Sequence, residues 1–193
     1  MNSSGDYERI LTLAKTWVCA DHHFGHRNIV KFLREDGSKL RPFETIEEHD
    51  EEIIRRHNDV VGDDDRVYFL GDFGNPSVVH RLKGRPVLVK GNHDDLKLSK
   101  YNGFQDIRGY VVKKGYILSH IPIHPGSMGR WQVNIHGHLH SEVVLQEHSV
   151  VQGSNPTSFS TEIPDPRYVC VSLEHTDYYP VDLQKLIDKF VKT

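Results

Sequence analysis

Polar side chains that could take part in metal chemistry follow apolar runs at five places in the chain. Residues 67–70 are typical of a buried strand, and Gly71 and Asp72 come directly after them. Glycine lets the backbone turn sharply, so the polar side chain stands at the end of the strand. Open α/β sheets bind ligands at such ends. The polar residues at the five places are Asp21, His22 and His23; Asp72; Asn92 and His93; Ser119 and His120; and His136, His138 and His140.

These residues follow a five-part order: Asp-x-His, Gly-Asp, Gly-Asn-His-Asp/Glu, a lone His, and Gly-His-x-His. The five parts in this chain are Asp21–His23, Gly71–Asp72, Gly91–Asp94, His120 and Gly137–His140. In this respect the chain resembles the calcineurin-like metallophosphoesterases, from about Trp17 to its end. The sequence between the motifs resembles that of a small, stand-alone branch of the family. The resemblance to this branch lies in residues 21–29, Arg41-Pro42-Phe43 and residues 58–72.

The resemblance implies a centre of two divalent metal ions. One ion would be bound by Asp21, His23, Asp72 and His140, and the other by Asp72, Asn92, His120 and His138. Imidazole, carboxylate and amide ligands without thiolate favour manganese, with Fe, Zn, Ni, Co or Mg as alternatives, over a calcium or cysteine-based zinc site. Two ions about 3.5–4 Å apart can clamp phosphoryl oxygens and generate hydroxide near neutral pH. The resemblance thus implies hydrolysis of a phosphate ester by a metal-bridging hydroxide.

Four further residues are candidates for the chemistry or for the substrate pocket. The resemblance gives His93 contact with the phosphate and protonation of the leaving oxygen, and the pKa of histidine near neutrality suits that role. We expect Asp94 to orient His93, as carboxylates often do for imidazoles. His26 and His124 are expected near the substrate, with a surface or core role as the alternative for each. Structural support is expected of two other neighbours, His22 and His136.

The elements that would position these residues alternate between strand and helix patterns. Thr45 and Glu48 form a capping box that predicts the start of a helix, and its apolar residues up to Val61 share one stripe. Other helices are expected over residues 28–33, 76–82 and 181–191. Strands are expected over residues 15–20, 67–70, 87–89, 104–107, 110–113, 116–118, 132–135 and 168–173. The resemblance implies an α/β fold, a four-layer α-β-β-α sandwich of two mixed sheets flanked by helices.

The length of 193 residues predicts a single domain, with residues 1–14 as an N-terminal extension. Residues 146–166 are polar and contain one Gly and three Pro, so we expect a loop insertion near the pocket. No signal peptide is apparent, and no apolar run approaches the ~18 residues of a membrane span. Cys19 and Cys170 give no disulfide framework, which fits a cytoplasmic protein without a membrane partner.

The composition and two variations within the motifs narrow the range of expected substrates. A net charge of −3 argues against a general nucleic-acid binder, which would be basic. Gly71-Asp72 is followed by Phe73-Gly74 instead of the Arg-Gly of protein Ser/Thr phosphatases, and Gly91-Asn92-His93 by Asp instead of Glu. We therefore expect a phosphodiesterase for a small or nucleotide-type substrate. The alternatives are a small-molecule phosphomonoesterase and a non-catalytic metal-binding scaffold that docks a partner protein.

Overall fold

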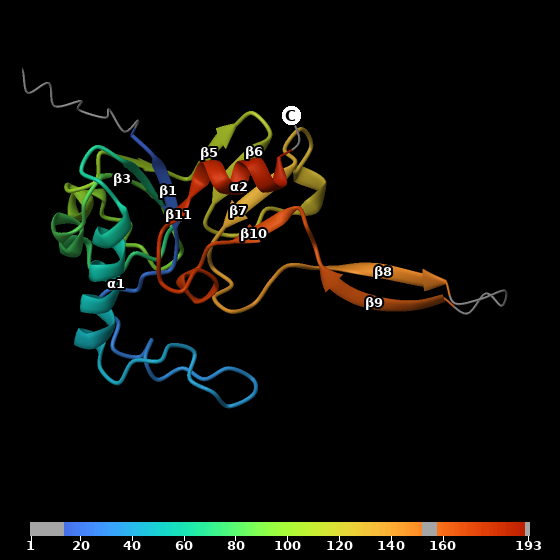
Figure 1. Cartoon of the computed structure of the whole chain (residues 1–193), viewed down its shortest axis with the longest axis horizontal. Helices are drawn as coiled ribbons and strands as arrows, with labels where there is room; N and C mark the ends of the chain where they lie inside the picture. Colours follow the sequence, from blue (N-terminus) through green and yellow to red (C-terminus); the bar gives the residue numbers. More distant parts are fainter. Residues whose placement is uncertain (1–13, 152–157, 192–193) are drawn as a thin grey trace, which may run out of the picture.

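Two mixed β-sheets form the frame of this α/β structure, a computed structural model that describes residues 14–151 and 158–191 (Figure 1). The expected N-terminal extension lies outside these residues, apart from Ala14. The first sheet has the order β11-β1-β2-β3-β4, with β1 to β4 parallel and β11 antiparallel to β1. Its strands are β1 (Thr16–Cys19), β2 (Arg66–Phe69), β3 (Arg85–Val89), β4 (Asp106–Arg108) and β11 (Val181–Asp182).

The second sheet has four strands in the order β10-β7-β6-β5. Strands β10, β7 and β6 are parallel, and β5 is antiparallel to β6. Its members are β5 (Tyr110–Lys113), β6 (Tyr116–Ser119), β7 (Val133–His136) and β10 (Tyr168–Cys170). All eight expected strands are therefore present, although their ends differ: β4 begins two residues later than expected and β10 ends three residues earlier.

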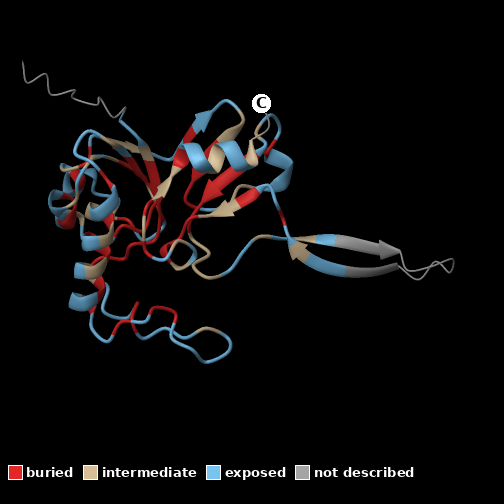
Figure 2. Cartoon of the chain, viewed as in Figure 1, coloured by how far each residue is buried: buried red, intermediate tan, exposed pale blue. Residues whose placement is uncertain are grey.

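The period-two alternation of strand side chains divides the core into two clusters. On β1, Trp17 and Cys19 belong to a cluster with α1, whereas Val18, together with Ala20 directly after the strand, belongs to a second cluster. This second cluster contains residues from both sheets, including Leu118 of β6. The two sheets therefore pack against each other through the second cluster. The first sheet is covered on its other face by the cluster that contains α1. Figure 2 shows the buried residues gathered along the strands.

Helix α1 (Ile46–Val60) begins where the capping box predicts. The Thr45 hydroxyl accepts the backbone N–H of Glu48 at 3.1 Å, while the Glu48 carboxylate accepts the N–H of Glu44 at 2.9 Å instead of that of Thr45. The expected apolar stripe is buried at Ile46, Ile53 and Ile54. This face attaches α1 to the outer side of the first sheet.

Helix α2 (Leu183–Phe190) lies within the helix expected over residues 181–191, and the Asp182 carboxylate caps it by accepting the N–H of Gln184 at 3.0 Å. Its apolar residues Leu186, Ile187 and Phe190 pack against the cluster that the two sheets share. No helix within the described ranges is long and apolar enough to cross a membrane.

The helix expected over residues 28–33 is wrong. The segment forms successive turns, in which the N–H of Ile29 donates to the carbonyl of His26 and that of Lys31 to Asn28, both at 2.9 Å. Ile29 is buried, but Phe32 and Leu33 are 46% and 62% exposed, so the three residues do not form one buried face. Short helices of the 3₁₀ type occur elsewhere: η1 (Pro76–Arg81), η2 (Leu98–Tyr101), η3 (Pro125–Ser127) and η4 (Leu173–His175).

The loop expected over residues 146–166 is also wrong in its secondary structure. The segment contains an antiparallel ribbon of β8 (Leu145–Val151) and β9 (Ser158–Pro164), which extends away from the two sheets (Figure 1). A two-stranded ribbon can satisfy backbone groups by pairing alone. The segment is too polar to show the apolar alternation that predicts a strand, although its Thr, Val and Phe residues have high strand propensity.

Candidate metal centre

The backbone is strained at most of the predicted ligands. Seven non-glycine residues of the described chain have positive φ, and five of them are predicted metal ligands. The left-handed conformation is uncommon outside glycine and concentrates at functional sites, where the surrounding structure enforces it. The five ligands and their φ values are Asp21 (60°), His23 (52°), Asp72 (51°), His138 (73°) and His140 (51°).

The motif glycines allow the strand ends to approach one another. A Cβ on Gly91 would lie 2.3 Å from Asp72 Oδ1, and a Cβ on Gly137 would lie 2.5 Å from Asp21 Oδ2. Neither position has room for a side chain. Glycine is therefore required for contact between motifs that are far apart in the sequence.

The first candidate metal group consists of Asp21, His23 and His140. One donor atom from each lies within 4.8 Å of the others. The rings of His23 and His140 are stacked with centroids 5.2 Å apart, and His23 Nε2 lies 3.8 Å from Asp72 Oδ2. The four residues that the resemblance assigns to the first ion, which are these three and Asp72, therefore lie close together.

The second candidate group consists of Asp21, Asp72 and His120, again with donor atoms within 4.8 Å of one another. His120 Nε2 lies 3.5 Å from Asp72 Oδ1 and 2.7 Å from Asn92 Oδ1. The His138 ring is 5.1 Å from that of His120. The structure therefore gathers all seven predicted ligands, with Asp21 closer to the second group than expected.

Unpaired buried atoms fit a cation at this site. Asp21 Oδ2 accepts the Ser172 hydroxyl at 2.7 Å and the His138 N–H at 2.9 Å, but Asp21 Oδ1 and His23 Nε2 are buried with no hydrogen-bond partner among the described residues. Burial raises the pKa of Asp21 and lowers that of His23 to about 2. A cation between them would favour the carboxylate and use the imidazole lone pair.

Hydrogen bonds fix the tautomers of two candidate ligands. His120 Nδ1 lies 2.8 Å from the carbonyl of Leu70, which can only accept, so Nδ1 carries the proton. His140 Nδ1 lies 2.9 Å from Glu174 Oε1 and donates to it in the same way. Both arrangements leave Nε2 as the lone-pair donor, the usual geometry of a metal-bound histidine.

Arg41 and Glu174 support the centre from behind, and sequence reasoning assigned a role to neither. Arg41 Nε donates to Glu174 Oε1 at 2.8 Å, and the two side chains are 0% and 1% exposed. The guanidinium also donates to the carbonyl of His22 and to His49 Nε2, at 3.1 and 2.7 Å. Burial alone would raise the pKa of Glu174, but Arg41 and His140 lower it to about 2. The carboxylate that orients His140 is therefore anionic.

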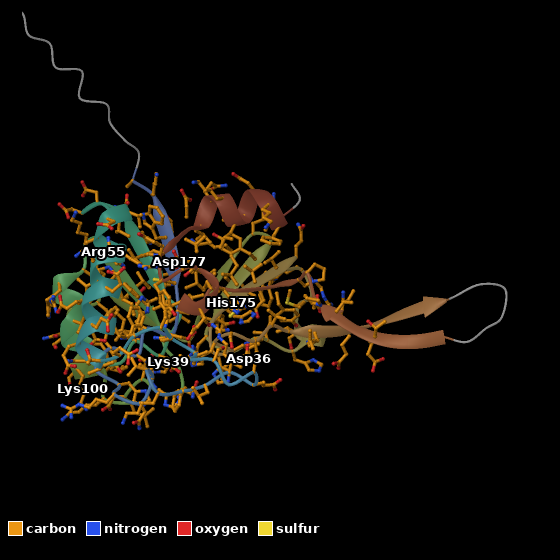
Figure 3. The ribbon with its side chains drawn as sticks, turned by 60° about the horizontal axis from the view of Figure 1, so that its bottom comes forward. Asp36, Lys39, Arg55, Lys100, His175 and Asp177 are labelled. Atoms are coloured by element: carbon orange, nitrogen blue, oxygen red, sulfur yellow. The ribbon has the colours of Figure 1, made fainter. Side chains whose placement is uncertain are left out.

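We expect Glu174→Ala to lower the free energy of unfolding by about 3–5 kcal/mol, because it leaves the Arg41 charge buried without its partner. Chemical denaturation with and without added metal measures the change. The control is Arg55→Ala on α1, labelled in Figure 3, whose bonds to Glu52 and Asp59 lie at the surface. That variant should denature near wild type, and equal losses in the two variants would contradict the support role of the buried pair.

The role expected of Asp94 is corrected by its contacts. Its carboxylate accepts three backbone N–H groups, from Asp72 at 3.0 Å, Phe73 at 3.0 Å and Gly91 at 2.7 Å, and among the described residues it has no hydrogen bond with the His93 ring. The backbone turns that end β2 and β3 present these donors around the carboxylate. Asp94 therefore joins the Asp72 turn to the Gly91 turn and positions the ligand backbone.

The remaining candidate residues surround the centre. His93 and His26 are exposed, and each has its ring centroid 5.7 Å from that of His23. His124 lines a pocket of about 620 Å³ that also includes Asn92 and His120. Two histidines that we expected to be structural are buried, His22 against phenylalanine rings and His136 on the second sheet.

Comparisons with known proteins identify relatives without stated activities. The chain is 29% identical over 194 residues to an uncharacterised protein of Methanocaldococcus jannaschii, covering 93% of this chain and 94% of that one. It is 25% identical over 179 residues to the Gene 66 protein of Mycobacterium phage L5, covering 70% and 82%. No family model matches. The crystal structure of a protein of unknown function from Aquifex aeolicus has a TM-score of 0.58 at 24% identity, with 92% and 100% covered, and thus shares the fold.

Proposed function

We propose that the chain is a dinuclear metal-dependent phosphoesterase, with a phosphodiester of small or nucleotide type as its substrate. The observation that carries the proposal is the convergence of five strand-end motifs. Four of them supply the two candidate metal groups that share Asp21, and the remaining one places Asn92 Oδ1 2.7 Å from His120 Nε2. The carboxylate of Asp72 spans the two groups, with one oxygen 3.8 Å from His23 Nε2 and the other 3.5 Å from His120 Nε2. The four-layer metallophosphoesterase sandwich belongs to the same proposal.

The side chains divide the chemistry between them. Two bound divalent ions would neutralise phosphoryl oxygens and supply hydroxide from water near neutral pH. Asp72 would hold the centre together, and Glu174 and the Leu70 carbonyl would keep His140 and His120 in the ligating tautomer. His93 is exposed beside His23 and belongs to neither metal group, so its imidazole is available to give a proton to the leaving oxygen.

A metal-supplemented activity screen tests the proposal. We expect hydrolysis of bis-p-nitrophenyl phosphate that is lost after chelation and restored by Mn²⁺, with slower reaction of p-nitrophenyl phosphate. Elemental analysis should find two ions per chain, because the two candidate groups share a carboxylate. Cyclic nucleotides extend the screen to natural diesters.

Other outcomes select the alternatives. Faster reaction of the monoester would identify a phosphomonoesterase. Two bound ions without hydrolysis of any ester would favour the metal-binding scaffold, and a single ion at saturating Mn²⁺ would contradict the dinuclear centre.

A further inference from the structure

A pocket of about 620 Å³ opens directly beside the candidate metal centre. It is lined by His120 of the second metal group and by Asn92, whose Oδ1 lies 2.7 Å from His120 Nε2, so a molecule held at that group could extend into it. Small-molecule sites typically occupy about 300–1,000 Å³. A methyl ester or a glycerol ester would leave most of this space empty.

The register of β5 and β6 explains which side chains form the floor of the pocket. Tyr110 pairs with Ser119 and Val111 pairs with Leu118. Because Val111 and Leu118 belong to the core that the two sheets share, Tyr110 and Ser119 face the opposite side of the second sheet. Both line the pocket, which therefore lies on the outer face of that sheet.

The chain that follows His120 forms the other wall. Ile121, Ile123 and Trp131 line the pocket from this segment, together with Ser127 of η3. Trp131 Nε1 is buried and has no acceptor among the described residues. Because that atom is closed to solvent, Trp131 contributes the surface of its ring to the pocket.

The charge around the pocket admits an anionic ligand. Of the described residues that line it, Lys90 is the one with a permanently charged side chain, and none is Asp or Glu. The rest of the lining combines apolar, aromatic and neutral polar side chains. Tyr110 and Trp131 supply its large rings, and Asn92, Ser119 and Ser127 can form hydrogen bonds. A flat heterocycle with hydrogen-bond acceptors, joined to a phosphate, combines all the properties that these walls accommodate.

We propose that this pocket binds the organic group of the substrate and that this group is a nucleoside. The inference rests on the proposed function for the position of the phosphoryl group, since that group would lie on the metal centre. Base stacking on an aromatic side chain is sequence-tolerant and substantial. The structure thus favours nucleotide phosphodiesters over small aliphatic esters.

Equilibrium binding tests the pocket without catalysis. Calorimetry of the Mn²⁺-loaded chain compares two non-hydrolysable ligands, the methylene phosphonate analogue of adenosine 5′-monophosphate and the same phosphonate of ribose. We expect the adenosine ligand to bind about tenfold more tightly, in line with the effect of stacking one base. Equal dissociation constants would overturn the inference.

Two variants test whether that preference comes from this pocket. Trp131→Ala removes one wall, and Ser127→Trp fills the space without removing a contact of the core. Each should reduce the ratio of the two dissociation constants toward one. The matched control is Ser99→Trp, an exposed serine in η2 beside Lys100, which is labelled in Figure 3. A ratio unchanged by Ser127→Trp would assign the preference elsewhere and overturn the inference.

A kinetic pair separates this inference from the proposed function. Methyl p-nitrophenyl phosphate and adenosine 5′-(p-nitrophenyl) phosphate release the same alcohol and differ in the group assigned to the pocket. Hydrolysis of both with equal kcat/KM would support the phosphoesterase and overturn the nucleoside pocket. Selective adenosine binding without hydrolysis of either ester would support the pocket and overturn the phosphoesterase.

Discussion

Asp72→Asn is expected to reduce the metal content from two ions per chain to nearly none. The two carboxylate oxygens of Asp72 face different groups, Oδ1 toward His120 and Oδ2 toward His23. Asparagine keeps the shape but replaces one oxygen by an N–H donor and removes the negative charge, so neither position retains its ligand set. Elemental analysis after dialysis against Mn²⁺ measures the loss. Because even partners behind a ligand affect activity or affinity by 10–100-fold, we expect hydrolysis to fall by more than about 100-fold.

The matched control is Asp36→Asn. Asp36 is an exposed loop carboxylate, labelled in Figure 3, that bonds to the N–H and hydroxyl of Ser38. That variant should keep both ions and full activity. Retention of one ion by Asp72→Asn would contradict a bridging role for this carboxylate. Retention of two ions would show that Asp72 is not needed as a metal ligand.

The residues of the centre could be predicted from sequence because each motif is local. An apolar run such as residues 67–70, followed by Gly71 and Asp72, specifies both a buried strand and a polar side chain at its end. Five such places in order carry the resemblance that implied the ligand set, and the sheet connections place them together. The start of α1 was predictable for the same reason, since Thr45 and Glu48 are three residues apart.

The supporting residues could not be predicted because their contacts join distant parts of the chain. Arg41 and Glu174 are separated by 133 residues, and nothing local to either indicates a buried ion pair. The role of Asp94 was predicted from its neighbour in sequence, His93, but its partners are backbone N–H groups from the turns after β2 and β3. A side chain type in a motif specifies neither its direction nor its partners.

The backbone conformation of the ligand residues was the other property that could not be predicted from the sequence. Asp and His at a strand end do not by themselves imply positive φ, which costs free energy for any residue with a Cβ. At Asp21 and Asp72 the conformation goes with close approach of neighbouring motifs, shown by the missing space for a Cβ at Gly137 and Gly91. The strain is therefore a property of the assembled centre and not of any single segment.

His93→Ala is expected to keep both metal ions and to lower kcat by roughly 10²–10⁴-fold, the usual contribution of a positioned acid. The backbone N–H of His93 donates to Asp72 Oδ1 at 2.9 Å, and alanine preserves that bond. The imidazole is exposed and belongs to neither metal group, so its removal should leave the ligands in place. The loss should be greatest for an alkyl ester, whose leaving oxygen needs a proton, and smallest for a p-nitrophenyl ester.

The comparison of leaving groups makes this prediction specific to proton donation. A residue that only binds the phosphate would affect alkyl and p-nitrophenyl esters by the same factor, whereas an acid affects the poorer leaving group more. His80→Ala, an exposed histidine in η1, is the control and should leave both rates unchanged. Loss of metal from His93→Ala would make it a ligand. Equal rate losses for the two esters would assign His93 to phosphate binding and leave the proton to another group at the entrance, where His26 also lies beside His23.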